Sequence, residues 1–434
     1  MSRITKPLLV VLIVVMTGSC MSSGPRKHDN AGEGEMASKM ELIPIVLVHG
    51  FLGFDADTLI KFPYWGGSVD LEAELQGAGL PVFSAMVGPV SSNWDRACEL
   101  YAFIKGGRVD YGAAHAAQYG HARFGREYPG VFPRWGTVNP QTGDVYKVHF
   151  IGHSMGGQTV RVLAHLLEYG DMAEAEFPQD DRSELFGGGH SWIHSVTSIS
   201  TPHDGTTLIY EYDEIGRMQK FLLQAVATVS LRRKEPTLDL MLEHWGAAVQ
   251  SDESFEDFIQ RAIKEDLWRN TDDFCYHDLN PAGAAELNGS VITCSDVYYF
   301  SWATSRTNPK EPDGVHVPMT GMNLPLHGNA KFIGSLVELP PICGDDPSLW
   351  WENDGIVNTC SMDGPSLGSV DTIVNLPQGE DPDRGVWNYM GTLKPYDHWQ
   401  IHIVPPVGNH APPGYESLVD FYVQWCRYLE GLPR

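Results

Sequence analysis

Residues 147–157 (KVHFIGHSMGG) constrain the fold of this chain more than any other stretch. Val148 to Ile151 is a β-branched and aromatic run, which is typical of a buried strand. The pentapeptide Gly152-His-Ser-Met-Gly156 follows, and an amphipathic segment comes after it. Strand, G-x-S-x-G and helix together predict a sharp turn that presents Ser154 above a sheet. Its hydroxyl becomes a nucleophile once a base takes the proton.

A second buried strand is predicted over residues 45–48, where the apolar run IVLV suits a strand covered on both faces. It leads into the loop His49 to Gly53. In hydrolases with this kind of turn, an early loop and the residue after the serine donate backbone N–H groups to an oxyanion. Phe51 and Met155 are therefore candidate donors. An ordinary tight turn is the alternative for the loop.

A catalytic serine also needs a base and an acid that orients it, in the chain order Ser, Asp or Glu, His. Asp354 and His398 fit that order and lie in predicted loops. The pattern alone does not single them out. Other residues of the right type remain open at this point: His327, His402, His410, Asp345 and Asp371.

The composition indicates a globular protein, and the first residues of the chain indicate export. The chain has 434 residues, 42% of them hydrophobic, and a formal charge of −25, which disfavours nucleic acid and anionic membranes as partners. Residues 1–20 resemble a secretion signal whose apolar run is too short to span a bilayer. Cys20 follows as in a lipoprotein signal, although Thr17 fits that pattern poorly. Residues 21–42 read as a flexible linker and 43–434 as one α/β domain.

Two further segments have more than one interpretation. Residues 106–135 read as an insertion, and its His115 and His121 are either a shared metal site or ordinary surface histidines. Residues 208–232 include an amphipathic helix that either packs in the core or forms a lid over the active site. Residues 305–345 are predicted to be loops. The short-loop disulfide guesses are Cys275–Cys294 and Cys343–Cys360.

Several motifs taken together resemble one known family. The motifs are Pro44 to Phe51, Ser92 to Cys98, Asp110 to Gly125, His153 to Gln158, Thr201 to Thr207 and Glu352 to Asn358. Together they are similar to the zinc-containing bacterial triacylglycerol lipases, the thermophilic Bacillus type, which are related to staphylococcal lipases. The similarity runs from about residue 43 to 430.

The resemblance implies an α/β-hydrolase fold, with a mostly parallel central sheet, helices on both faces, a small zinc-binding insertion and a helical lid. It implies ester hydrolysis with Ser154 as nucleophile, His398 as base and Asp354 as the acid. It also implies that Phe51 and Met155 form the oxyanion hole.

The resemblance also implies metal sites. A structural zinc would be held by Asp95, His115, His121 and Asp272, with Asp273 as an adjacent rival for the last place. The family's calcium site would need two carboxylates after the base. Gln400 and Pro405 replace them here, and calcium needs hard anionic oxygens. We therefore expect this site to be lost or much weakened.

The predicted function is a secreted serine ester hydrolase, or one lipid-anchored through Cys20. A triacylglycerol lipase that acts at a lipid interface is the leading interpretation. A short-chain esterase or an acyltransferase with the same three residues is the alternative. A surface binding protein on the hydrolase scaffold comes last.

Overall fold

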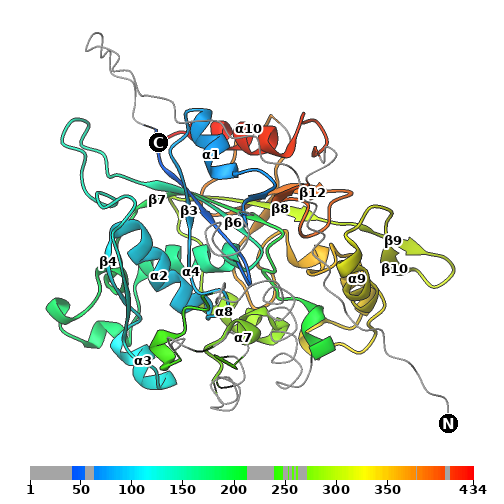
Figure 1. Ribbon diagram of the computed structural model, residues 1–434, viewed down its shortest axis with the longest axis horizontal. Helices are drawn as coiled ribbons and strands as arrows, with labels where there is room; N and C mark the ends of the chain where they lie inside the picture. The colour runs from blue at the N-terminus through cyan, green and yellow to red at the C-terminus, as the bar shows by residue number, and fades with distance from the viewer. Residues whose placement is uncertain are drawn as a thin grey trace, which may run out of the picture.

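The computed structural model describes residues 42–53, 63–212, 239–247, 253, 257, 258, 261, 271–377, 379–405 and 411–434. A seven-stranded sheet runs through its centre (Figure 1). Its strands, in spatial order, are β11 (Ile373–Asn375), β12 (Trp387–Leu393), β8 (Tyr298–Thr304), β7 (Ile193–Ile199), β6 (Val148–His153), β1 (Ile45–Val48) and β3 (Val82–Ala85). Every neighbouring pair is parallel.

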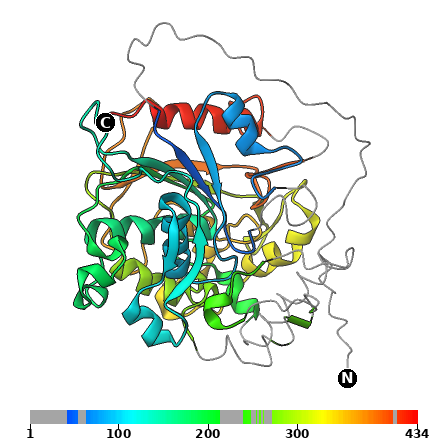
Figure 2. The same cartoon turned by 60° about the vertical axis from the view of Figure 1, so that its left-hand side comes forward.

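Helices cover both faces of this sheet (Figures 1 and 2). One face carries α1 (Leu71–Gly77) and α10 (Leu418–Glu430), and the other carries α2 (Asn93–Lys105), α4 (Met155–Tyr169) and α8 (Pro281–Ser290). Strand β1 shows why its sequence is apolar throughout. Val46 and Val48 belong to the core on the α2–α4 side, and Ile45 and Leu47 to the core on the α10 side. The predicted parallel α/β architecture is confirmed.

The parallel topology brings the ends of distant strands together. The carboxyl ends of β1, β6 and β8 lie at one edge of the sheet, because parallel strands all point the same way. A small parallel ladder, β2 (Gly66–Gly67) with β13 (Ile403–Val404), joins the segment after β1 to the segment after β12. Ligand sites in such sheets lie at this edge.

The predicted insertion is a small unit beside the main sheet. Strands β4 (Gly107–Asp110) and β5 (Phe124–Tyr128) pair antiparallel, and α3 (Ala113–Tyr119) connects them. Helix α7 (Cys275–Leu279) lies on the same side of the molecule (Figure 1).

Two expectations are wrong. Residues 305–345 are not all loop: β9 (Thr307–Lys310) and β10 (Val315–Pro318) form a hairpin, and α9 (His327–Ile333) follows. These elements are too short to produce a clear sequence period, and α9 forms because Ala330 and Ile333 are buried by neighbouring segments. The four cysteines of the guessed disulfides, Cys275, Cys294, Cys343 and Cys360, are free thiols.

Several predicted segments lie outside the described residues. They are the signal at 1–20, nearly all of the linker at 21–42, and the predicted lid from residue 213 onward. The short helix η4 (Thr207–Tyr212) precedes that region. Among the helices that the structure describes, none combines the length and the apolar character that crossing a bilayer requires.

Candidate active site

Ser154 occupies the sharp turn between β6 and α4. Its φ of 55° and ψ of −133° lie outside the helical region, and only 6% of the residue is exposed. The turn is possible because its neighbours are glycines. A Cβ atom at Gly156 would lie 2.2 Å from the carbonyl oxygen of Val48, and one at Gly152 would lie 2.5 Å from the nitrogen of Gly157. The glycines therefore let the start of α4 pack directly against β1.

Asp354 and His398 are hydrogen-bonded to each other. His398 Nδ1 lies 2.7 Å from Asp354 Oδ2, and the His398 N–H donates to the Asp354 carbonyl at 3.0 Å. The carboxylate is fully buried and accepts further bonds from the N–H groups of Ile356 and Val357 and from the Thr304 hydroxyl. These donors fix the orientation of the carboxylate, so that Oδ2 faces His398 Nδ1 as the acid that orients a base must do.

The other candidate histidines and carboxylates have different surroundings. His327 Nε2 pairs with the Met322 carbonyl, and His402 Nδ1 pairs with the Tyr64 carbonyl. Asp371 accepts from Thr293, Asp345 is exposed, and His410 lies outside the described residues. Of the alternatives left open by sequence, only Asp354 and His398 form an acid–base pair in the described part of the chain.

The loop after β1 lies against Ser154. A Cβ atom at Gly50 would lie 2.6 Å from the Cβ of Ser154, so only glycine permits this approach. Phe51 follows Gly50, and Met155 is the first residue of α4. Buried Arg96 holds the loop in place, because its guanidinium donates hydrogen bonds to the carbonyls of His49 and Gly88. Burial lowers the pKa of Arg96 to about 10, which leaves it charged at neutral pH.

A second cluster of titratable groups lies between α2 and the insertion. Ligand-type atoms of Asp95, His115, His121 and Asp273 all lie within 4.8 Å of one another. Asp95 Oδ1 and His121 Nε2 are buried without a hydrogen-bond partner. The other nitrogen of His121 is 2.9 Å from the Ala122 carbonyl, to which it donates, so Nε2 is left with a lone pair that faces the cluster.

The two carboxylates of this cluster attract positive charge, either as protons on the imidazoles or as a bound cation. Burial disfavours charge on His115, but hydrogen bonds to Asp273 and Asp95 raise its pKa to about 9. Burial disfavours charge on Asp95 too, but the neighbouring imidazoles of His115 and His244 lower its pKa. His244, which the sequence did not suggest, lies 2.9 Å from Asp95 Oδ2. Two buried carboxylates with two imidazoles fit a divalent metal ion.

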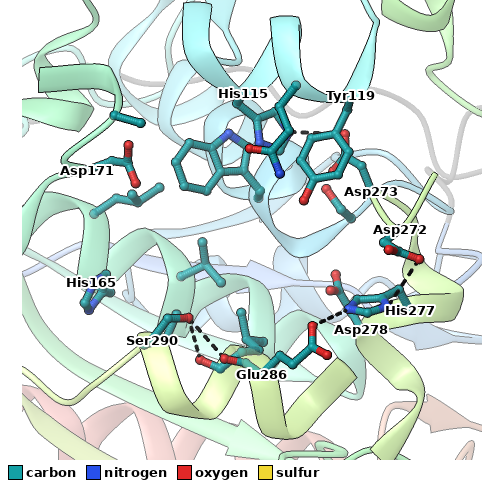
Figure 3. A pocket seen from close by; sticks show the side chains of 18 of the residues that line it. His115, Tyr119, His165, Asp171, Asp272, Asp273, His277, Asp278, Glu286 and Ser290 are labelled. Carbon is teal, nitrogen blue, oxygen red and sulfur yellow. Dashed lines mark hydrogen bonds and ion pairs between the residues drawn. The ribbon is translucent and has the colours of Figure 1, made fainter. Parts of the chain in front are cut away.

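The structure corrects one member of the expected set. Asp272 does not join the cluster: its side chain is 80% exposed and lies 3.7 Å from His277. Asp273, with a side chain only 2% exposed, lies 3.1 Å from His115 and 3.2 Å from His121. Adjacent residues point in different directions here, and sequence spacing could not decide between them. Figure 3 shows Asp273 beside His115, with Asp272 turned toward His277.

Figure 3 also shows a cavity beside the cluster, with a volume of about 360 Å³. His115 and Asp273 line one side, and His165 and Glu286 line another. Neither Ser154 nor His398 is among the described residues that line it, so it is separate from the Ser154 turn.

Comparison with known proteins gives the family. A family model described as "Lipase-like, C-terminal domain" matches residues 41–424. The chain belongs to this lipase-like family. It is 35% identical over 395 residues to a lipase of Staphylococcus hyicus, covering 89% of this chain and 57% of that one. The chain thus spans little more than half the length of this curated relative.

Solved structures agree with the family assignment. EstA from Clostridium botulinum is 40% identical with a TM-score of 0.80, over 91% of this chain and 88% of that one. Lipase 1 from Pelosinus fermentans is also 40% identical, with a TM-score of 0.78, over 91% of this chain and all of that one (100%). Such similarity confirms the expected resemblance and the α/β-hydrolase fold.

Proposed function

We propose that this member of the lipase-like family is a serine ester hydrolase that acts on acylglycerols through an acyl-enzyme. The hydrogen-bonded pair of Asp354 and His398, at the same sheet edge as the Ser154 turn, carries the proposal. The named lipases among its relatives support lipid esters as the substrate class.

In the proposed reaction, His398 takes the proton of Ser154 as the hydroxyl attacks the ester carbonyl. Asp354 fixes the base with its proton on Nδ1, because the carboxylate can only accept a hydrogen bond. His398 then gives the proton to the leaving alcohol, and an acyl-serine remains. Water repeats the sequence, with the same base, and releases the acid.

The oxyanion is assigned to the backbone N–H groups of Phe51 and Met155. Two observations support this. Gly50 brings the loop of Phe51 against Ser154, and Met155 opens α4, where the helix dipole favours negative charge. Each such donor contributes about 3–4 kcal/mol to transition-state stabilisation in comparable enzymes.

We propose zinc as the ion held by Asp95, His115, His121 and Asp273. Bound there, it would tie α2, the insertion and the segment before α7 together. Four protein ligands leave no open position for a water nucleophile, so the role is structural.

Calcium near the base is not part of the proposal. The Gln400 side-chain oxygen already accepts from the guanidinium of Arg306 and from the N–H of Asp397. Export through residues 1–20, acylation of Cys20 and a lid over 208–232 remain predictions from the sequence.

The test is hydrolysis of short and long acyl esters, below and above their solubility limits, by the wild type and by Ser154→Ala. A rate increase on long-chain emulsions indicates a lipase, and activity confined to soluble esters indicates an esterase. Acyl transfer to added glycerol in preference to water would indicate a transferase. Persistence of hydrolysis in Ser154→Ala at the wild-type rate would refute the proposal.

A further inference from the structure

A buried cluster of aromatic rings lies next to His398, the proposed base. His153, the residue before the nucleophile, has its ring centroid 4.7 Å from that of His398 and 4.3 Å from that of His402. Tyr64 stacks on His402 at 4.3 Å. His153 and His402 are 0% and 3% exposed. Burial, together with neighbouring imidazoles, lowers the pKa of His153 well below its ordinary value and that of His402 to about 3. Both rings are therefore neutral at neutral pH.

The hydrogen bonds around His153 can run in only one direction. Its Nε2 lies 3.1 Å from the carbonyl oxygen of His398, which can only accept, so Nε2 carries the proton. In a neutral ring Nδ1 is then an acceptor, and Tyr64 O–H donates to it at 2.6 Å. The Tyr64 oxygen in turn accepts from the N–H of Gly50 at 3.0 Å. Burial raises the pKa of Tyr64, so its hydroxyl keeps the proton that it donates.

This chain of three hydrogen bonds connects the three parts of the proposed site. It begins at Gly50 in the oxyanion loop, passes through the end of the nucleophile strand at His153, and ends on the peptide of His398. The His398 N–H and ring are already held by Asp354. The bond from His153 secures the carbonyl side of the same residue, which Asp354 does not hold.

We propose that His153 is a positioning residue, whose Nε2–H fixes the backbone of His398 relative to Ser154 and whose Nδ1 couples that position, through Tyr64, to the oxyanion loop. The inference rests on the proposed function and deepens it. His153 touches neither substrate nor the reacting atoms in this account. It sets the distance between nucleophile and base, on which the rate depends steeply.

Two variants of His153 separate its two hydrogen bonds, the one from Nε2 to the His398 carbonyl and the one that Nδ1 accepts from Tyr64. The amide nitrogen of His153→Gln can occupy the place of Nε2 and donate to the His398 carbonyl. The amide oxygen of His153→Asn can occupy the place of Nδ1 and accept from Tyr64, but it leaves the His398 carbonyl without a donor. With a soluble short-chain nitrophenyl ester, we expect kcat to fall about 10- to 100-fold in His153→Asn, with KM nearly unchanged. His153→Gln should retain more of the wild-type kcat than His153→Asn, because it keeps the donor to the His398 carbonyl and loses only the acceptor for Tyr64.

The matched control is His149→Asn, because His149 lies on the same strand, is equally buried and bonds Ser195 through Nδ1. It should lose stability as His153→Asn does, without the loss of kcat. Equal kcat values for the two His153 variants, or equal losses in His153→Asn and the control, would overturn the positioning role.

Nitrogen NMR of the wild type at neutral pH tests the hydrogen-bond chain without reference to activity. We expect His153 as the neutral Nε2–H tautomer. A protonated ring or an Nδ1–H tautomer would overturn the inference. A wild type that hydrolyses no ester, yet shows the expected tautomer, would refute the proposed function and the positioning role of His153 while leaving the hydrogen-bond chain intact.

Discussion

Replacing Asp354 with asparagine should abolish catalysis and leave the fold nearly intact. Asp354 Oδ1 accepts from the N–H groups of Ile356 and Val357, at 3.0 and 2.8 Å, and neither donor can be reversed. The asparagine oxygen must therefore take the place of Oδ1, and its NH2 group the place of Oδ2. That group would face His398 Nδ1, now 2.7 Å from Oδ2, and donate to it. His398 would then carry its proton on Nε2 and could not accept another from a nucleophile.

The expected loss follows from this wrong tautomer. The same substitution in serine-protease triads lowers kcat by about 10⁴, or about 5 kcal/mol of transition-state stabilisation. Stability should change little, because Thr304 can adapt. Its hydroxyl donates to Asp354 Oδ2 at 2.8 Å and lies 2.7 Å from the Ser200 hydroxyl, so Thr304 can instead accept from the new NH2 group and donate to Ser200.

The assay is steady-state hydrolysis of a soluble ester, with urea unfolding as a check on the fold. Asp204→Asn is the control, since Asp204 is also a buried carboxylate that accepts from Ser366, Leu367 and Asn288. We expect it to keep kcat within about tenfold of the wild type, a change of about 1.4 kcal/mol in the activation free energy. A loss in Asp354→Asn no larger than in this control would refute the reasoning.

Three further predictions follow from other parts of the structure. Asp273→Ala should lose bound zinc, whereas Asp272→Ala should keep it, as measured by elemental analysis. Loss of zinc in Asp272→Ala alone would show that the ligand is Asp272, as the sequence suggested. Burial raises the pKa of Glu430 to about 7, so its folded form favours the protonated carboxyl. The free energy of unfolding should therefore fall as pH rises from about 4.5 to 7, and Glu430→Gln should reduce that slope in urea titrations; an unchanged slope would count against the assignment. Arg306→Leu should lower the free energy of unfolding by about 2–4 kcal/mol, because the guanidinium donates hydrogen bonds to the carbonyls of Pro395 and Thr320 and to the side chain of Gln400. Added calcium should not restore it, and recovery of the melting temperature with calcium would show that a calcium site persists.

The sequence predicts the architecture well because its strongest signals are local. The apolar run at 45–48 and the strand, glycine turn and helix at 148–169 each form as expected. The hairpin of β9 and β10 and helix α9 were missed, since short elements stabilised by their neighbours leave no period in the sequence.

The sequence proposes the residue types of the candidate site, but it does not show which of these residues contact one another. Spacing could not separate Asp273 from Asp272, because the decision depends on which side chain turns inward. The sequence contains no pattern that points to Thr304, Tyr64 or His244. Each of them contacts the candidate sites through a hydrogen bond to a residue far away in the chain. The histidine of the Gly-His-Ser-Met-Gly motif was visible in the sequence, but the role proposed for it depends on the backbone of His398, 245 residues away.

The most direct test of the central claim is mass spectrometry of the intact protein after reaction with a fluorophosphonate. A nucleophilic Ser154 with a working base predicts one covalent adduct, on the peptide that contains Ser154. We expect no adduct in Ser154→Ala and slow labelling in His398→Ala. Labelling of the wild type at another residue, or no labelling of the intact folded protein, would contradict the account.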